Sequence, residues 1–293
     1  MEKPKISVII ASYNSSKTIE GCLKSLEEQT TELEFEIIVV DSSNDGTGEL
    51  VERKFPYVKI YQSQERRFPG DARNIGISLA KGKIIAFIDA DCRAEKNWIK
   101  EILRAHESPH PVIGGAIANA DPKSYIGWAA YFCEFSNWMP GVQHGWLDDI
   151  PAANISYKRE IFDLYGRFIE GTYCSDTEFH WRLGKDGHRL LFVPSILVSH
   201  SCIDKLERFL RHEVFHGKCF AKVRVHAQDF SRGKRLAYVL FSPLIFIRLF
   251  LKAGLNNINN RVYFSNFLRS LPLLTLGIIC WSFGEFLGYL SEV

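Results

Sequence analysis

The sequence of 293 residues predicts an α/β protein, with a Rossmann-like, mostly parallel sheet flanked by helices and a helical appendage at the C-terminus. Three observations predict this class. Short apolar runs alternate with segments of helical periodicity over the first 90 residues. Polar residues gather where successive apolar runs end. Two longer apolar segments, residues 236–251 and 271–290, close the sequence.

The expected strands are continuous apolar runs, the pattern of strands that are buried on both faces of a sheet. They cover residues 6–11, 35–40, 58–61, 84–88, 112–118, 152–157 and 190–199. Helical spacing is clearest at Ile19, Cys22, Leu23 and Leu26. Further helices are expected over residues 48–55, 71–80 and 175–183. The alternation of strand and helix in the first half implies parallel strands with right-handed crossovers.

Polar side chains follow three of these strands, at residues 12–14, 41–45 and 89–91. Ligands of parallel α/β sheets bind beyond the carboxyl ends of the strands, so we expect one binding site there. Exposure to water explains any one of these loops equally well, but it explains three successive strand ends less well.

The triplet Asp89-Ala90-Asp91 is the most informative of these strand ends. Its two carboxylates are spaced i and i+2, so they point to the same side. Like charges held this close raise each other's pKa, and a cation relieves the repulsion. Oxygen ligands of this kind suit Mg²⁺ or Mn²⁺ bound together with substrate phosphates. Taken alone, such a triplet also occurs in solvated turns.

Composition excludes several classes of protein. With 46% apolar residues the chain can bury a large core, and its net charge of +2 gives no case for nucleic-acid binding. Residues 205–235 carry nine Lys and Arg against three acids, a charge of +6, which leaves −4 elsewhere. The seven cysteines are an odd number without a C-x-x-C pair, so neither a disulfide framework nor a zinc site is expected, and a reducing cytoplasm is favoured. The N-terminus lacks the apolar core of a signal peptide.

Residues 6–14, 39–47, 70–76, 89–91 and 154–176, in this order, resemble glycosyltransferase family 2. The resemblance is to inverting enzymes of GT-A fold, of the membrane-associated bacterial or archaeal type, and covers about residues 5–225. It implies a nucleotide-sugar donor, with UDP favoured as the nucleotide, bound through Mn²⁺ or Mg²⁺.

On the donor side, the resemblance implies that the nucleotide sugar is held by Ala11, Ser12, Tyr13, Asp41, Arg73, Asp89 and Ala90. It further implies that Asp91 binds the metal, and His200 matches a histidine that completes the metal site in some GT-A enzymes. The loop at Asp41 is one residue shorter than the commonest family pattern, which leaves its individual contacts less defined.

On the acceptor side, Asp176 matches the family's catalytic base, and Ser175 stands where another acid usually precedes it. Inversion in a single displacement needs a base that takes the proton of the acceptor hydroxyl, which a carboxylate can do. The resemblance also places Asn154 and Trp181 near the acceptor.

Several of these residues have an ordinary structural interpretation as well. An aspartate at a helix start, such as Asp176, often caps the helix and interacts with its dipole. Arg73 could form a surface salt bridge, and His200 could be a half-exposed residue at a strand end. These alternatives stay open at the level of the sequence.

The apolar segments at the C-terminus predict contact with a membrane surface. Residues 236–251 fall short of a bilayer span, and residues 271–290 contain Glu285, which is costly at membrane depth. We therefore expect helices that lie in the interface or re-enter it, with the basic residues 205–235 facing anionic headgroups on the cytoplasmic side. A single span over residues 271–290, a soluble appendage and an oligomer contact are the alternatives.

The predicted organisation is a GT-A domain over residues 1–225 and a membrane-associated helical region over residues 226–293. The predicted function is transfer of one sugar to a hydroxyl of a lipid-linked or glycan acceptor. Two rivals are a polyprenyl-phosphate sugar synthase and a non-catalytic scaffold that binds nucleotide sugars. The short pattern His212-Glu213-x-x-His216 formally allows a zinc protease, although such motifs match often by chance.

Overall fold

A sheet of nine strands organises the first of two units in the computed structural model, which describes residues 4–31 and 34–292. This sheet unit comprises Met1–Ala118 and Gln143–His200. The second, helical unit comprises Asn119–Val142 and Ser201–Val293. Each unit is therefore built from two separate stretches of the chain.

The sheet unit alternates between strand and helix up to its fourth strand, as the apolar periodicity predicts. In chain order its elements are β1 (Ile6–Ser12), α1 (Ile19–Glu27), β2 (Phe35–Asp41), α2 (Thr47–Lys54), β3 (Lys59–Gln62), α3 (Pro69–Leu79), β4 (Ile84–Ile88), β5 (Cys92–Ala94), α4 (Trp98–Ala105), β6 (Val112–Asn119), β7 (Gly145–Leu147), β8 (Asn154–Lys158), α6 (Glu160–Tyr165), α7 (Ser175–Lys185) and β9 (Leu190–His200).

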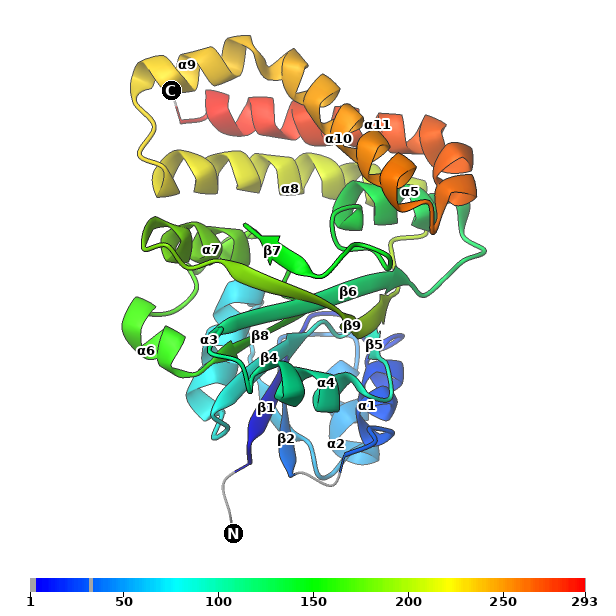
Figure 1. The fold of residues 1–293 in the computed structure, drawn as a ribbon, viewed down its shortest axis with the longest axis vertical. Helices are drawn as coiled ribbons and strands as arrows, with labels where there is room; N and C mark the ends of the chain where they lie inside the picture. The colour runs from blue at the N-terminus through cyan, green and yellow to red at the C-terminus, as the bar shows by residue number, and fades with distance from the viewer. Residues whose placement is uncertain (1–3, 32–33, 293) are drawn as a thin grey trace. The chain divides into compact units, whose positions relative to one another are not determined.

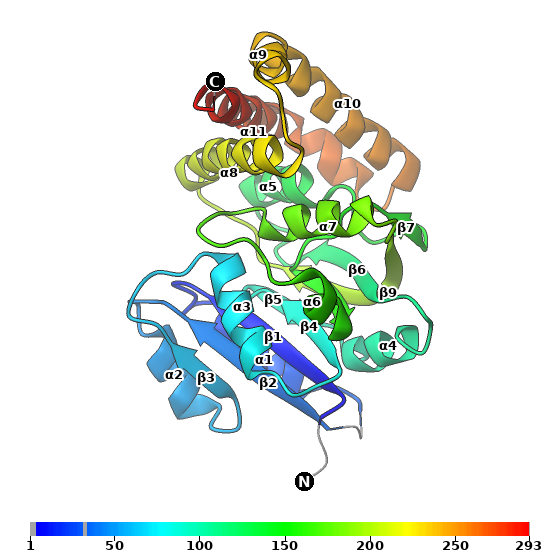
Figure 2. The same cartoon turned by 90° about the vertical axis from the view of Figure 1, so that its left-hand side faces the viewer.

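Four strands, in the order β3-β2-β1-β4, form the parallel half of the sheet. Strands β1, β2 and β4 are almost wholly buried. Helix α3 lies on one face of these strands and helices α1 and α2 on the other (Figure 1), and α3 is in front of the strands in Figure 2. All four apolar residues that predict α1 are buried, so the helical spacing there identifies its core face correctly. The predicted parallel α/β arrangement is confirmed for this half.

The other half of the sheet is antiparallel. Strand β8 runs antiparallel to both β4 and β6, and β9 runs antiparallel to both β5 and β7. Apolar runs predict that a strand is buried but not its direction, so the sheet is less parallel than the sequence suggests. Strands β5 and β7, of three residues each, are too short to produce a pattern.

The helical unit has α11 as its central helix. Its elements are α5 (Tyr125–Phe135), α8 (Leu206–Ala227), α9 (Arg232–Leu240), α10 (Ser242–Asn260) and α11 (Phe264–Leu290). Helices α8 and α11 run side by side (Figure 1). A Cβ on Gly217 would lie 2.3 Å from the carbonyl oxygen of Trp281, and one on Gly284 would lie 2.2 Å from that of Val214. Glycine at these two positions lets the two backbones touch.

The aromatic residues of α5 form part of the core of the helical unit. Trp128, Tyr131 and Phe132 are 6%, 0% and 1% exposed. Tyr263 packs against Trp128 in a tilted arrangement with 4.9 Å between the ring centroids, and Phe267 meets Phe132 edge-on at 5.4 Å. These rings therefore hold α5 to the chain around the start of α11.

Glu285 of α11 is buried inside the helical unit at 3% exposure. Its carboxylate accepts hydrogen bonds from the indole of Trp281 at 2.7 Å and the hydroxyl of Tyr289 at 2.9 Å. Among the described residues, α11 alone is long and apolar enough to cross a membrane by itself, and 44% of its most apolar window is buried. Helices α9 and α10 pass the same test as a pair bent by 68°.

The unit boundary differs from the predicted one. The expected division at residue 225 falls inside α8, which ends at Ala227, and α5 belongs with the helices rather than with the sheet. The reason is packing: α8 buries Phe209, Ala221 and Val225 within the helical unit. The basic stretch predicted to face headgroups is thus largely one amphipathic helix with a buried side.

Candidate active site

The loops that follow β1 and β2 are tied together by hydrogen bonds. The backbone N–H of Asn14 donates to Ser43 Oγ at 2.7 Å, and that of Asn44 donates to Asn14 Oδ1 at 3.1 Å. The strand register sets Ser12 opposite Asp41. Asp41 is 3% exposed and accepts a 2.5 Å hydrogen bond from the Ser43 hydroxyl. Two of the three polar strand ends are therefore joined, as the sequence predicts.

Tyr13 presents its ring at this edge of the sheet and is 41% exposed. The guanidinium carbon of Arg66 lies 4.5 Å from the centroid of this ring and 5.4 Å from that of Phe68. An exposed aromatic ring beside a guanidinium plane is suited to stacking a planar base. Sequence reasoning missed Arg66, because it lies outside every motif and only its position above Tyr13 marks it.

Arg73 contacts the third strand end, at Asp89. It extends from α3, is 6% exposed, and its Nη2 donates to Asp89 Oδ1 at 2.8 Å. Asp89 keeps 31% of its side chain exposed. Arg73 is therefore a buried cation paired with a half-exposed carboxylate, and the surface salt bridge considered for it from the sequence is not what the structure has.

Asp91 and His200 lie together, as a shared metal would require. Strand β5 pairs with β9 so that Cys92 faces His200 in register. His200 Nε2 is 3.3 Å from Asp91 Oδ1. Adjacent ligands of an octahedral ion at 2.0–2.1 Å are about 3.0 Å apart, so this spacing fits one Mn²⁺ or Mg²⁺ bound to both. The Cys92 sulfur is within 4.8 Å of these atoms, but such ions prefer oxygen and nitrogen ligands.

Asp176 sits in the first turn of α7, and Cys174, not Asp176, is the N-cap residue. Its Oδ2 accepts a hydrogen bond from the backbone N–H of Ala152 at 2.9 Å, and its Oδ1 accepts one from that of Thr177 at 3.1 Å. Burial alone would raise the pKa of Asp176, but the charge of Arg73, the neighbouring His180 and the hydrogen bonds from these two N–H groups outweigh burial and lower the pKa below its usual value. Asp176 is thus held as a carboxylate, the form that accepts a proton.

His180, one turn further along α7, is a buried residue that the sequence does not single out. Its Nδ1 lies 2.6 Å from Asp149 Oδ1 and its Nε2 lies 2.6 Å from the Tyr157 hydroxyl. Asp149 also accepts a 3.0 Å hydrogen bond from the Thr177 hydroxyl. This network fixes the turn of α7 that carries Asp176. The spacing of the histidines along the sequence gives no signal for it.

The start of α3 holds the loop that leads into α7. Asn74 donates to the carbonyl of Phe168 at 3.0 Å and accepts from its N–H at 3.1 Å, and Asp71 accepts from the N–H of Gly171 at 2.7 Å. A Cβ on Gly70 would lie 2.7 Å from Ser175 Oγ, so the two helix starts touch. The stretch of residues 70–76 therefore both supplies Arg73 and positions the helix of Asp176.

Other predicted residues are placed as follows. Ser12 and Ala90 are buried at 3% and 5% exposure, and Ala11 is half-buried at the end of β1. Trp181 is half-buried on α7.

Asn154 is not available to an acceptor, contrary to its predicted position. It is 0% exposed, its Oδ1 accepts from the Trp98 indole at 2.8 Å, and its Nδ2 donates to the carbonyls of Ala116 and Ile196, each at 2.8 Å. Asn154 ties β8 to β6 and β9, and we assign it a structural role.

The fold and this arrangement of side chains define a glycosyltransferase of GT-A fold. The sequence profile described as Glycosyl transferase family 2 matches residues 7–165, more than half of the chain, and the chain belongs to that family.

Individual proteins support this conclusion. Glycosyltransferase AglE of Haloferax volcanii is 27% identical over 205 residues, which are 67% of this chain and 67% of the relative. In three further curated glycosyltransferases the match spans 29% to 31% of the relative's length.

Two solved structures share the fold. One is the mannosyltransferase PcManGT from Pyrobaculum calidifontis in complex with GDP-Man and Mn²⁺, with a TM-score of 0.66 and 17% identity over 97% of this chain and 88% of that one. The other is S. aureus TarS 1-349 in complex with UDP-GlcNAc, with a TM-score of 0.57 and 20% identity over 96% of this chain and 90% of that one.

Proposed function

We propose that this chain is a metal-dependent inverting glycosyltransferase. It moves one sugar from a nucleotide-diphosphate sugar, with UDP favoured, to a hydroxyl of a lipid-linked or glycan acceptor. The observation that carries the proposal is the place of Arg73, which pairs with Asp89 and also lowers the pKa of Asp176. One buried cation thus connects the donor side to the base.

On the donor side, Tyr13 and Arg66 stack the base of the nucleotide, and Asp41 and Asp89 bind its polar groups. Asp91 and His200 hold the metal, whose positive charge stabilises the leaving diphosphate. Arg73 adds charge-assisted hydrogen bonds to phosphate oxygens. The neighbours that carry GDP-Man with Mn²⁺ and UDP-GlcNAc support a nucleotide-sugar donor of this kind.

On the acceptor side, Asp176 takes the proton of the attacking hydroxyl. Its lowered pKa keeps it ionised at neutral pH, and its two backbone hydrogen bonds fix the direction of the carboxylate. Trp181 stays a proposed acceptor contact on the same helix.

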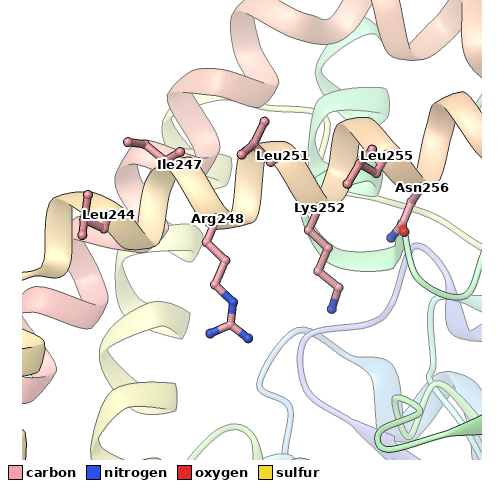
Figure 3. Close-up of a pocket in the computed structure, with 7 residues that line it drawn as sticks. All are labelled: Leu244, Ile247, Arg248, Leu251, Lys252, Leu255 and Asn256. Carbon is pink, nitrogen blue, oxygen red and sulfur yellow. The ribbon is translucent and has the colours of Figure 1, made fainter.

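We also propose that the acceptor lies at the cytoplasmic face of a membrane, which α10 contacts. Leu244, Ile247, Leu251 and Leu255 recur along one side of α10 and are 49% to 59% exposed. In Figure 3 these apolar side chains extend from one side of the helix and Arg248 and Lys252 from the other, and all six residues line one groove. An exposed apolar stripe beside two cations suits anionic lipid headgroups above an apolar layer.

A polyprenyl-phosphate sugar synthase is the second candidate. A phosphate acceptor is already ionised and needs little help from a base, and the cations Arg248 and Lys252 of the α10 groove suit a membrane that contains anionic lipids of this kind. The two functions differ in their dependence on Asp176.

A donor screen tests the proposed function. We expect one nucleotide sugar to raise the melting temperature in Mn²⁺ and to lose that effect in chelator, because a ligand of the native state stabilises it. Asp176→Asn should then retain donor binding and hydrolysis while it loses transfer to a hydroxyl. Full transfer by this variant to a polyprenyl phosphate would establish the second candidate, and stabilisation by no nucleotide sugar would refute the donor site.

A further inference from the structure

Glu213, on α8 of the helical unit, is a buried carboxylate without a partner. It is 1% exposed, and among the described residues neither of its carboxylate oxygens has a hydrogen-bond partner. Buried polar groups in proteins are nearly always hydrogen-bonded, and an isolated buried charge is very costly. Burial raises the pKa of Glu213 well above its usual range, and the charge of Glu134 raises it further. A carboxylate in this position is stabilised either by a proton or by a cation bound beside it.

Two more ligand side chains meet Glu213. His212 precedes it on α8, and Glu134 comes from α5. His212 Nε2 lies 3.4 Å from Glu134 Oε1, and one ligand atom of each of the three residues lies within 4.8 Å of the others. The two helices thus bring one imidazole and two carboxylates to a single point.

We propose that Glu134, His212 and Glu213 bind a divalent transition-metal ion that fastens α5 to α8. An imidazole nitrogen with two carboxylate oxygens is a ligand set suited to Zn²⁺, and also to Mn²⁺. The ion neutralises the buried carboxylate and supplies the partner that Glu213 lacks.

The cluster is also open to solvent on one side. The side chains of His212 and Glu134 are 26% and 17% exposed, whereas Glu213 forms the buried floor. An ion can therefore enter past His212, and water can complete its coordination.

This arrangement replaces the protease interpretation of the His-Glu-x-x-His pattern. In that motif both histidines bind zinc and the glutamate acts as a base. Here Glu213 lies among the ligands, and the third ligand comes from α5. The ring of His216 packs edge-on against His212 at 5.3 Å and against Trp281 at 4.7 Å.

The experiment uses the full chain with Asp91→Asn, which removes a ligand of the donor-site metal in the other unit. After treatment with chelator, Zn²⁺ is titrated by calorimetry, and the melting temperature is measured with and without Zn²⁺. We expect one Zn²⁺ per chain and a higher melting temperature. Adding Glu213→Gln should weaken Zn²⁺ binding at least about 10-fold and abolish the shift.

Glu207→Gln is the matched control, because this glutamate of α8 is 78% exposed and pairs with Arg211. Added to the Asp91→Asn chain, Glu207→Gln should leave the Zn²⁺ affinity and the shift in melting temperature unchanged. A second readout is Co²⁺ absorption, whose visible bands should change in Glu134→Gln. The proposal is wrong if the Asp91→Asn chain binds no Zn²⁺, or if Glu213→Gln leaves the affinity unchanged. If Glu213 is protonated and purely structural, Glu213→Gln should leave the Zn²⁺ affinity unchanged. Neither of these two results bears on the donor site.

Discussion

Arg73 Nη2 lies 2.8 Å from Asp89 Oδ1, and the same guanidinium lowers the pKa of Asp176. A single arginine on α3 therefore acts on the triplet at the end of β4 and on the carboxylate at the start of α7. Loss of this residue should affect both donor binding and proton transfer.

Arg73→Met should lower kcat/KM roughly 100-fold, because Asp89 on the donor side and the proposed base Asp176 both lose the cation that orients them. Arg73→Lys should recover part of the loss, since it keeps the charge but not the fork of donors. Steady-state kinetics with the identified donor measure this. Arg104→Met is the control: its pair with Glu101 is 66% exposed on the arginine side, so activity should change little. Equal losses in both variants would contradict the role of Arg73.

Asp176→Asn should lower kcat by about 10²- to 10⁴-fold with little change in donor affinity. The asparagine oxygen can still accept the hydrogen bond from Ala152, so the fold should persist. Single-turnover kinetics and donor titration separate the two effects. Asp186→Asn, at the exposed C-terminal end of the same helix, should have near wild-type activity.

The pH profile of the reaction should reflect the lowered pKa of Asp176. Arg73 and His180 face this carboxylate, and Tyr157 lies nearby on β8. Because its pKa is below the usual value of about 3.9, the base stays ionised at every pH above this value. Any stability that ionised Asp176 contributes is likewise present above that value and lost as pH falls through the lowered pKa.

The acidic limb of kcat/KM should therefore lie below about pH 4 in the wild type and move to higher pH in Arg73→Met. Rates measured from pH 4 to 9 in both proteins check this shift: the wild type should show no acidic limb in this range, and Arg73→Met should show one. Profiles that coincide in the two proteins would show that Arg73 does not control the base.

Asn74→Ala should loosen the loop that enters α7. Two hydrogen bonds to Phe168 and one to Glu170 are lost, and a buried backbone donor and acceptor stay unsatisfied, at a cost of about 1–3 kcal/mol. We expect a lower melting temperature and a lower kcat with unchanged donor affinity. Asn259→Ala, at an exposed position on α10, should be within about 0.5 kcal/mol of the wild type. A variant of Asn74 with normal kcat would argue against the positioning role.

The exposed stripe of α10 should control binding to lipid vesicles. Leu251→Glu with Leu255→Glu should abolish flotation with vesicles that contain anionic lipid, because the change adds negative charge to the face that meets the headgroups. Leu164→Glu is the matched control, since Leu164 is 74% exposed on α6 of the sheet unit. Flotation that survives the change on α10 would leave α10 without a membrane role.

The sequence predicts best where one local signal decides the structure. The apolar runs locate β1, β2 and β4, and the polar strand ends locate Asp41, Asp89 and Asp91. Contacts between distant segments leave no such signal. Asp149 and His180 are 31 positions apart and Asn74 and Phe168 are 94 apart, so their pairing depends on the tertiary fold. Asn154 is expected near the acceptor, but its side chain is completely buried, and burial of a polar residue of this kind is decided by the tertiary fold.

Residues 119–142 leave the sheet unit and return to it, and this excursion has a consequence for biosynthesis. Helix α5 emerges from the ribosome well before its packing partner α11: Cys133 and Leu274, which are in contact, are 141 positions apart. The aromatic side of α5 therefore stays uncovered during synthesis until α11 has been made. A chain that stops before α11 would keep that surface exposed for good, and chaperones and proteases recognise surfaces of this kind.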